Sequence, residues 1–339
     1  MGDGLASVFP GATFVARPIA DGGEGLVGAI VAASPEIIGS EMKAIGPQTA
    51  GPGGEDVFPF ALSPDGTAVI EMASTAGLDL CRQRGLTHRT ADTFGVGLQI
   101  AALAGAFPGV ERIVVGLGGS GTNDGGWGMA RALGWREENG RLVAPGTKLP
   151  KIVAACDVTN PLLGPNGCTR VFGPQKGITP DDFEWHEARL ARLAAHFPAE
   201  LAETPGAGAA GGLGFGLLAF CNAHIESGFS LFASLAGLQA AIASADLVVT
   251  GEGSLDAQTL NGKGPHGVAR MAHAAGKPVL GIAGRVTPDA RPAFDLSLAV
   301  SPADLPLAEA QRLAPQLIHA AIARSADAIR ALLPSHPPA

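Results

Sequence analysis

Residues 116–134 read GLGGSGTNDGGWGMARALG, a stretch dense in glycine that follows the apolar run RIVV at 112–115 and precedes a segment of helical composition. Glycine between a strand and a helix is entropically costly, so a chain keeps it where φ must be positive or where a ligand approaches the main chain. Backbone N–H groups at the start of a helix bind anions, helped by the helix dipole. The stretch therefore predicts a strand, a ligand-binding loop and a helix, which together are the repeating unit of an α/β fold.

Outward from this stretch, apolar runs alternate with alanine-rich helical segments along the chain. The strand-like runs lie at 13–20, 67–73, 112–118, 151–158, 246–253, 278–284 and 296–302. Most of them are continuous rather than alternating, as expected for strands that helices cover on both faces. We therefore expect an α/β fold.

Length and composition predict two domains. A chain of 339 residues with 46% hydrophobic content exceeds the usual size of a single core. Between residues 41 and 65, Gly and Pro separate short β-like pieces, which predicts hairpins, a mixed sheet and the start of a second domain. The Pro- and Gly-rich stretch at 197–216 fits either a crossing between domains or a ligand loop.

Charge and composition exclude several classes of protein. The net charge is −8 and the Lys and Arg residues are scattered, so nucleic acid is not an expected partner. The four cysteines form no CxxC pair and are expected to be reduced thiols. The N-terminus MGDGLASVFP lacks a targeting pattern, and no apolar run reaches the length of a membrane span. A cytoplasmic protein without membrane contact is therefore expected.

Gly116, Gly118 and Gly121 match the G-x-G-x-x-G pattern of dinucleotide-binding loops, and Glu137 and Glu138 stand at about the distance of a ribose contact. Against this interpretation, polar residues suited to a helix N-cap follow where the pattern requires a helix, and further glycines come after them. A P-loop is absent, because no segment reads G-x-x-x-x-G-K-[ST]. An NAD(P)-dependent oxidoreductase stays open as an alternative function.

Four other segments are acidic or rich in glycine, and most of them come at the carboxyl end of an expected strand: 21–25, 155–177, 206–216 and 251–269. In an open α/β sheet, ligands bind beyond these strand ends. For any one segment, a carboxylate that caps the next helix is an equally good interpretation. Carboxylates gathered beside phosphate-binding backbone are nevertheless what Mg²⁺-dependent phosphoryl transfer requires. The residues by themselves therefore point to a kinase.

Four stretches follow one another along the chain: GGSGTNDGGWGMARALG, ACDVTNPLLGPNGCTRVFGPQKG, GAGAAGGLGFGLLAF and VVTGEGSLDAQTLNGKGPHGVA. In this order, and together with DGGEG near the N-terminus, they resemble the bacterial glycerate kinase type 1 family. The resemblance implies transfer of phosphate from ATP, with Mg²⁺, to D-glycerate, most often to the 2-hydroxyl to give 2-phosphoglycerate. It also implies a Rossmann-like parallel-sheet domain with a second, mixed-sheet α/β domain inserted into it, and an active site in the cleft between them. We place the first domain at 1–39 plus 201–339 and the second at 40–200, and leave a homodimer open.

Members of this family usually begin with a further strand and a loop that carries Asp, Ser and Lys, whereas this sequence begins in the helix that follows, at GDGLASVFPGA. If that strand is central to the first sheet, its loss leaves two neighbouring strand edges unpaired. Two explanations are open. The start is misassigned, which we favour, or the chain is truncated and is a non-catalytic kinase homologue.

Candidate site residues follow from the motifs and the resemblance. We expect Asp157 to accept the proton of the glycerate hydroxyl, Asn160 to orient the substrate and Lys176 to neutralise charge on the transferred group. Binding of phosphate or substrate is assigned to Gly118, Gly119, Ser120, Thr122, Asn123, Gly251, Gly253 and Lys263. The Mg²⁺ ligands are sought among Asp21, Asp124, Glu252 and Asp256, which the sequence does not rank.

Overall fold

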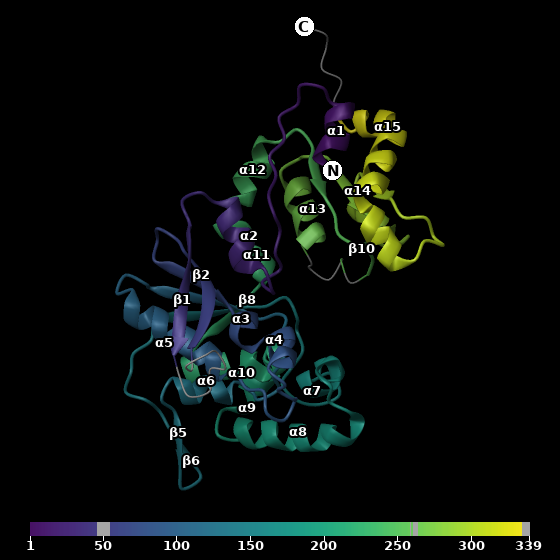
Figure 1. The fold of residues 1–339 in the computed structure, drawn as a ribbon. Coiled ribbons are helices and arrows are strands. Elements are labelled where there is room, and N and C mark those ends of the chain that lie inside the picture. The colour runs from purple at the N-terminus through teal and green to yellow at the C-terminus, as the bar shows by residue number, and fades with distance from the viewer. Residues whose placement is uncertain (46–54, 258, 260–263, 334–339) are drawn as a thin grey trace. The chain divides into compact units, whose positions relative to one another are not determined.

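Three of the expected strand runs, 67–73, 112–118 and 151–158, pair side by side within one six-stranded sheet (Figure 1). The structure is a computed structural model that describes residues 1–45, 55–257, 259 and 264–333. Its contacts divide the chain into a larger unit, Pro18–Ala236, and a smaller unit formed by Met1–Arg17 and Gly237–Ala339. Each unit combines its own sheet with helices, so the mixed α/β class is confirmed.

The sheet of the larger unit has the spatial order β1-β2-β3-β4-β7-β8. Its strands are β1 (Ile38–Ile45), β2 (Glu55–Leu62), β3 (Thr67–Glu71), β4 (Arg112–Gly116), β7 (Lys151–Ala155) and β8 (His224–Glu226). β1 and β2 form an antiparallel hairpin, β2 pairs antiparallel with β3, and the pairs from β3 to β8 are parallel. The register places Glu71 beside Gly116, Gly116 beside Ala155, and Ala155 beside Glu226. Four strands therefore reach their carboxyl ends along one edge of the sheet.

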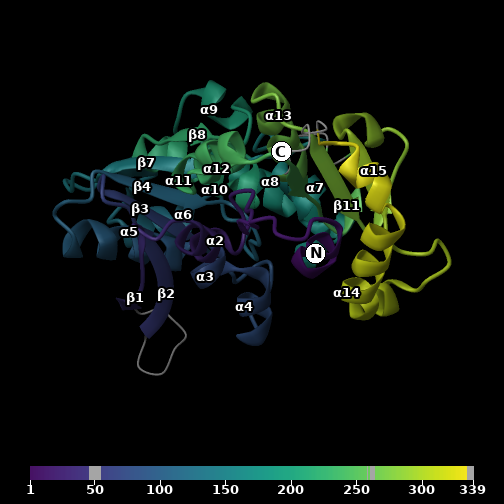
Figure 2. The same cartoon turned by 90° about the horizontal axis from the view of Figure 1, so that it is seen from above.

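Helices cover both faces of this sheet (Figures 1 and 2). The helices of the larger unit are α2 (Leu26–Ala33), α3 (Ala73–Ala76), α4 (Leu78–Gln83), α5 (Phe94–Ala106), α6 (Trp127–Ala132), α7 (Cys168–Phe172), α8 (Pro180–Ala194), α9 (Ala199–Glu203), α10 (Ala209–Cys221) and α11 (Gly228–Leu235). A 3₁₀ turn spans Pro174–Lys176, and a small hairpin pairs β5 (Arg136–Glu138) with β6 (Arg141–Val143). The sheet is therefore the middle layer of a three-layer unit.

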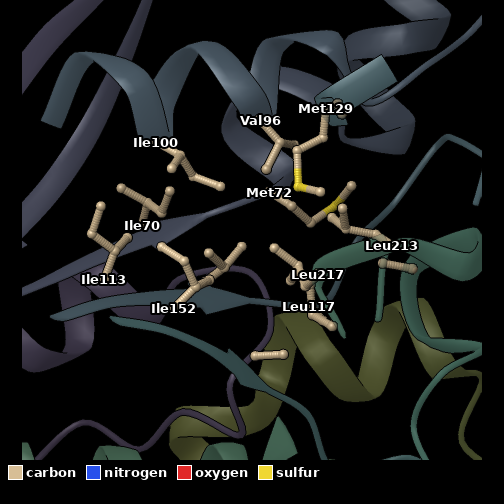
Figure 3. Packing of buried hydrophobic residues seen from close by; sticks show 14 of the residues in the cluster. Ile70, Met72, Val96, Ile100, Ile113, Leu117, Met129, Ile152, Leu213 and Leu217 are labelled. Atoms are coloured by element: carbon tan, nitrogen blue, oxygen red, sulfur yellow. The ribbon is translucent and has the colours of Figure 1, made fainter. Parts of the chain in front are cut away.

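Alternation of side chains along the strands explains the two cores of the larger unit. Ile70, Ile113 and Ile152 from three neighbouring strands point to the face covered by α5, α6 and α10 (Figure 3). The intervening residues, such as Val114, point to the opposite face, which α2 and α11 cover. Because both faces are buried, the central residues of β3, β4 and β7 are apolar on both faces, which is why their runs are continuous in the sequence.

The smaller unit contains a parallel sheet of three strands in the order β13-β11-β9. Its strands are β9 (Val248–Thr250), β11 (Val279–Ala283) and β13 (Leu296–Ala299), and a separate parallel pair joins β10 (Ser254–Leu255) to β12 (Arg285–Val286). Its helices are α1 (Gly2–Val8), α12 (Leu238–Ser244), α13 (Gly264–Ala274), α14 (Leu307–Arg324) and α15 (Ala326–Arg330), with a 3₁₀ turn at Arg291–Ala293. Residues of α1 and α14 share one core with β11 and β13.

Most of the expected strands form, and one does not. The runs at 246–253, 278–284 and 296–302 contain β9, β11 and β13, and the hairpin expected within 41–65 is β1–β2. The prediction of a strand at 13–20 is wrong, because these residues have no strand pairing and Phe14 and Val15 are 45% and 66% exposed. An apolar run becomes a strand only where another strand edge takes up its backbone hydrogen bonds.

The bounds of the two units differ from the expected domains, which were 1–39 plus 201–339 and 40–200. Residues 18–39 belong to the larger unit because α2 packs on its sheet, and residues 201–236 belong to it because β8 pairs with β7. The Rossmann-like domain with an inserted mixed-sheet domain stays a prediction. Within the described ranges, none of the helices combines the length and the apolar character that crossing a membrane requires.

Candidate active site

Loops from four parts of the sequence meet at the carboxyl edge of the larger unit's sheet. They are 21–25 before α2, 117–124 after β4, 156–160 after β7, and Ser227 with Gly228 after β8. The loops approach so closely that a Cβ on Gly118 would lie 2.4 Å from Cα of Gly23, and one on Gly22 would lie 2.7 Å from Cα of Gly228. Glycine is needed at these two positions for the loops to come together.

Glu71, the last residue of β3, holds the loop at 21–25 in place. The side chain is buried, and its two oxygens accept hydrogen bonds from the backbone N–H groups of Gly25 at 2.9 Å and Val27 at 2.7 Å. The carboxylate therefore takes up N–H groups at the start of α2, where the helix dipole favours negative charge. Glu71 is not among the residues predicted from the sequence, where the only signal for it is a carboxylate at the end of the apolar run TAVIE.

Asp157 lies half-buried just after β7. One of its oxygens accepts a hydrogen bond from Oγ of Ser227 at 2.8 Å, and the other accepts one from the N–H of Phe229 at 3.0 Å. Burial raises the pKa of Asp157, and the charge of Asp21 acts in the same direction, whereas these hydrogen bonds oppose the rise. The structure thus brings together two of the predicted residues, Asp157 and the exposed Asp21.

The glycine-rich loop after β4 presents open backbone beside this pair. Gly119 is exposed and has a φ of +66°. Within the part of the chain that the structure describes, no group accepts a hydrogen bond from the N–H of Gly118 or Gly119. Gly119 also borders a hollow of about 370 Å³ whose lining includes Glu24, Ser74 and Asp79. Two adjacent N–H groups at the edge of a hollow can bind an anion.

A buried side chain, that of Lys176, holds the residues of the same loop that follow Gly119. Nζ of Lys176 donates hydrogen bonds to Oγ of Ser120 and to the carbonyl oxygen of Thr122, both at 2.7 Å. Lys176 is only 7% exposed, and burial lowers the pKa of its ammonium group to about 8. No described carboxylate forms an ion pair with it. The predicted Lys176 therefore lies against the buried side of the loop, where it contacts Ser120 and Thr122.

A kink at the start of α10 packs against the loop from another side. Ala210, Gly211 and Gly212 all have left-handed backbone conformations. A Cβ on Gly211 would lie 1.9 Å from the carbonyl oxygen of Thr122, so no other residue fits there without displacing the loop. The stretch at 197–216 thus includes α9 and this kink, and its glycines let α10 approach the loop.

Asp124, a predicted Mg²⁺ candidate, is 1% exposed. One oxygen accepts hydrogen bonds from N–H and Oγ1 of Thr93 at 2.9 and 2.8 Å and from the N–H of Gly128 at 2.9 Å. The other accepts one from the N–H of Gly126 at 3.2 Å. These donors lie at the beginnings of α5 and α6, so the carboxylate links two helix starts. Thr93 is not among the residues predicted from the sequence, because it is distant from Asp124 along the chain.

The dinucleotide pattern does not have its structural context here. The third glycine of G-x-G-x-x-G must lie in the helix that follows the strand. Gly121 instead donates its N–H to the carbonyl oxygen of Ala76, and α6 begins only at Trp127. The loop therefore differs from a Rossmann dinucleotide turn.

The remaining predicted residues of the larger unit are held within it. Asn160 donates a hydrogen bond from Nδ2 to the carbonyl oxygen of Asn166 at 2.8 Å. Thr122 and Asn123 are buried, and no described group bonds to Oγ1 of Thr122 or to Oδ1 of Asn123. A buried polar atom without a partner is costly, so these two atoms are candidates for contact with a ligand.

The smaller unit has its own glycine loop, after β9. A Cβ on Gly251 would lie 1.8 Å from the carbonyl oxygen of Ile282. Glu252 accepts a hydrogen bond from Oγ1 of Thr259, and the N–H of Asp256 donates to the same Oγ1 at 3.1 Å. Gly253 is exposed, and Lys263 lies outside the described residues.

No metal-binding cluster is ready-made among the described residues, because no three carboxylate, imidazole or thiol side chains gather at one point. Mg²⁺ in phosphoryl-transfer enzymes needs only one or two carboxylates, since phosphate oxygens and water supply its other ligands. The neighbouring carboxylates Asp21 and Asp157 fit that requirement, whereas the oxygens of Asp124 already accept four hydrogen bonds.

Comparison with known proteins gives one family. Residues 1–330 match the model of the Glycerate kinase family. A glycerate kinase of Bacillus subtilis strain 168 is 39% identical over 91% of this chain and 86% of its own length. A glycerate 2-kinase of Escherichia coli K12 is 40% identical over 84% of this chain and 80% of its own length. The crystal structure of a candidate glycerate kinase 2 from Salmonella typhimurium LT2 has a TM-score of 0.78 at 35% identity, covering 97% of this chain and 92% of that one.

Proposed function

The chain belongs to the glycerate kinase family, which makes it a phosphotransferase, and we propose that it transfers the γ-phosphoryl group of ATP to the 2-hydroxyl of D-glycerate, giving 2-phosphoglycerate. One observation in the structure supports this function most strongly. Two hydrogen bonds fix the carboxylate of Asp157, and burial, with a smaller contribution from the charge of Asp21, raises its pKa. It lies at the sheet edge where the open backbone of Gly118 and Gly119 also lies.

Asp157 is the proposed proton acceptor. The hydroxyl oxygen of glycerate attacks the γ-phosphorus of ATP, the bond from that phosphorus to the β-phosphate oxygen breaks, and the hydroxyl proton passes to Asp157 as ADP leaves. A general base works best when its pKa lies close to the working pH, and burial together with Asp21 moves the pKa of Asp157 upward. Ser227 and the N–H of Phe229 fix the direction of the carboxylate.

The glycine-rich loop is the proposed anion site. Its N–H groups at Gly118 and Gly119 can donate to phosphate oxygens or to the glycerate carboxylate without reorganisation during the reaction. Lys176 keeps the loop in shape through Ser120 and Thr122 and contributes a positive charge beneath it. The loop thus has free N–H groups at Gly118 and Gly119, while Lys176 holds its other residues in place. Such an arrangement suits a preformed binding loop.

Asp21 is the proposed ligand of Mg²⁺ in this unit. It is exposed, and one of its oxygens accepts a hydrogen bond from the N–H of Gly23 at 3.1 Å, which orients the carboxylate. Mg²⁺ held by this carboxylate would neutralise negative charge that develops on the phosphate groups. Asp21 also raises the pKa of Asp157, so it supports the base independently of any metal.

The experiment is a turnover assay on the full chain. ADP release is measured with ATP, Mg²⁺ and D-glycerate, beside reactions that contain L-glycerate or no glycerate, and ³¹P NMR of the product distinguishes phosphate on the 2-hydroxyl from phosphate on the 3-hydroxyl. Release that depends on D-glycerate, with the 2-phosphate as product, supports the proposal. A 3-phosphate product overturns the regiochemistry, and NADH binding without glycerate-dependent ADP release supports the oxidoreductase instead.

A further inference from the structure

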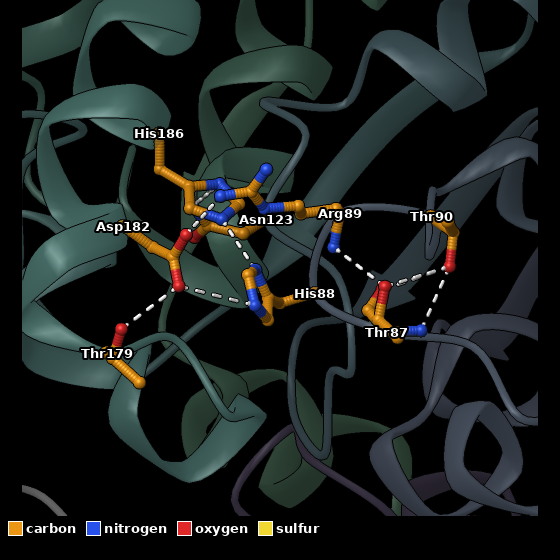
Figure 4. A network of polar contacts seen from close by, with 8 residues as sticks. All are labelled: Thr87, His88, Arg89, Thr90, Asn123, Thr179, Asp182 and His186. Carbon is orange, nitrogen blue, oxygen red and sulfur yellow. Dashed lines mark hydrogen bonds and ion pairs between the residues drawn. The ribbon is translucent and has the colours of Figure 1, made fainter.

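A row of polar side chains connects the glycine-rich loop to the surface of the larger unit (Figure 4). Nδ2 of Asn123 lies 3.3 Å from Nδ1 of His186, and Nε2 of His186 lies 3.0 Å from Nδ1 of His88. Nε2 of His88 in turn lies 3.6 Å from an oxygen of Asp182. His186 and Asp182 come from α8, and His88 comes from the segment between α4 and α5. Three separate parts of the sequence thus meet in this row.

His186 is neutral in the folded protein at neutral pH. It has no exposed surface, and burial lowers its pKa to about 4. The groups around it are charged or titratable: His88, Arg189 and Arg89 further lower this pKa, whereas Asp182 opposes them. A neutral imidazole has one N–H donor and one nitrogen acceptor, so the contacts of one nitrogen determine the role of the other.

The contact with Asp182 indicates which nitrogen donates and which accepts in each hydrogen bond of the row. An ionised carboxylate can only accept, so its electrostatic contact at 3.6 Å, which is longer than a hydrogen bond, favours the proton of His88 on Nε2 and leaves its Nδ1 as an acceptor. His186 must then donate from Nε2, and its Nδ1 accepts from the carboxamide of Asn123. The hydroxyl of Thr179 donates to Asp182 at 3.0 Å, and the ion pair with Arg89 keeps the pKa of Asp182 low, so the carboxylate stays ionised.

The carboxamide of Asn123 is oriented as a consequence. Its Nδ2 faces the acceptor nitrogen of His186 and also donates to Oγ1 of Thr169 at 3.0 Å, so both amide hydrogens are used. Oδ1 is therefore the one polar side-chain atom of Asn123 that is still able to form a hydrogen bond. Among the described residues it has no hydrogen-bond partner, although Asn123 is only 1% exposed. A buried acceptor without a partner is costly, which makes this oxygen a candidate for contact with a ligand.

We propose that His186, oriented by His88 and Asp182, is a positioning residue that fixes the carboxamide of Asn123 so that Oδ1 accepts a hydrogen bond from a hydroxyl group of the substrate. The inference rests on the proposed function, because D-glycerate supplies that hydroxyl. It adds residues to the site that touch neither substrate nor ATP and act only through Asn123.

Nitrogen NMR on the wild-type full chain tests the direction of the row without any substitution. With ¹⁵N-labelled histidine, His186 and His88 are both expected to carry their proton on Nε2. Titration with D-glycerate in the presence of a non-hydrolysable ATP analogue is expected to shift the side-chain amide resonances of Asn123. Protons on Nδ1, or an amide that does not respond to D-glycerate, overturn the inference.

A matched pair of variants on α8 tests the functional role. Asp182→Asn replaces a carboxylate that can only accept with an amide that can also donate to His88, whereas Asp181→Asn removes the same charge from the neighbouring position outside the row. We expect Asp182→Asn to raise KM for D-glycerate by about fivefold, with KM for ATP unchanged, because one oriented hydrogen bond contributes about 1 kcal/mol. Asp181→Asn is expected to match the wild type in both constants.

The outcomes separate this inference from the proposed function. Equal KM values for D-glycerate in Asp182→Asn and Asp181→Asn overturn the inference, while wild-type turnover of glycerate still supports the function. A wild type that shows the expected tautomers and the shift of Asn123 with D-glycerate, but no ADP release, overturns the function and supports the inference. A thermal melt of both variants identifies any general loss of folding, which would raise both KM values together.

Discussion

Asp124 and Asp157 follow neighbouring parallel strands of one sheet, yet their surroundings are opposite. Asp124 is 1% exposed, and its oxygens accept four hydrogen bonds from Thr93, Gly126 and Gly128. Asp157 is half-buried, accepts from Ser227 and Phe229, and lies beside the charge of Asp21. The first carboxylate is taken up by the protein's own donors, whereas the second remains available to a ligand.

A conspicuous sequence motif does not by itself identify the reactive residue. The glycine-rich loop is the most conspicuous feature of the sequence, but its carboxylate joins the beginnings of α5 and α6. The less conspicuous loop after β7 carries the carboxylate with a raised pKa. The surroundings of the two carboxylates explain the difference. Several hydrogen-bond donors stabilise the ionised form of Asp124, which serves the structure, whereas partial burial and a like charge raise the pKa of Asp157, which suits it to proton transfer.

Asp157→Asn is the substitution with the largest expected effect. An amide cannot accept the hydroxyl proton, so we expect kcat to fall by about 10³-fold, within the range that general-base catalysis contributes. Its remaining oxygen can still accept one of the two hydrogen bonds, so the melting temperature should change little. ADP release and a thermal melt measure the two effects. Retention of activity would move the role of base away from Asp157.

Asp124→Asn is expected to act on stability instead. Its amide group would face N–H donors that now bond to a carboxylate, and the free energy of unfolding should fall by about 3 kcal/mol. Urea unfolding of this variant and of Asp157→Asn gives the contrast directly. A variant with unchanged stability but an increased requirement for Mg²⁺ would instead support Asp124 as a metal ligand, the role that the sequence predicts as one of its alternatives.

Lys176→Met is expected to reduce activity without reducing stability, because Lys176 holds the glycine-rich loop in shape but is a buried charge. Loss of the bonds to Ser120 and Thr122 should lower kcat/KM by about 100-fold, comparable to the loss of a preorganised donor. Stability at pH 7 should not fall, because the buried ammonium group, whose pKa is lowered from 10.5 to about 8, is replaced by an apolar chain of similar length.

The same variant also has a pH signature. Between pH 8 and 10.5 the unfolded chain binds more protons at Lys176 than the folded chain, so this group makes the wild type more stable as pH rises through that interval. Denaturant unfolding at several pH values should show that contribution in the wild type and not in Lys176→Met. Identical pH dependence in both proteins would show that Lys176 is not a buried charge.

Asp21→Asn has the smallest expected effect and tests the pairing with Asp157. The charge of Asp21 raises the pKa of Asp157, so its removal lowers that pKa and keeps the base ionised at lower pH. The acid limb of the pH profile of kcat/KM should therefore move to lower pH. Profiles at saturating Mg²⁺ separate this effect from weaker metal binding, and a shift to higher pH would contradict the pairing.

Much of the fold could be predicted because strand composition is local. The central residues of the runs that became β3, β4 and β7 are apolar on both faces, since both faces of the sheet are buried, and the Gly- and Pro-rich break after residue 40 marks the β1–β2 hairpin. The same reasoning failed at 13–20, where the run is apolar but no strand pairs with it. Pairing depends on a partner elsewhere in the chain, which composition does not reveal.

The α/β class, the family resemblance and the position of Asp157 and the glycine-rich loop at strand ends follow from the amino-acid sequence alone, because strand composition and motif order are properties of neighbouring residues. The role of each polar group depends on the folded chain. The partners of Asp124, Lys176 and Asn123 lie 31, 56 and 63 positions away, at Thr93, Ser120 and His186. Such pairs form only when sheet register and helix packing bring distant segments within hydrogen-bond distance, and this is a property of the folded chain as a whole.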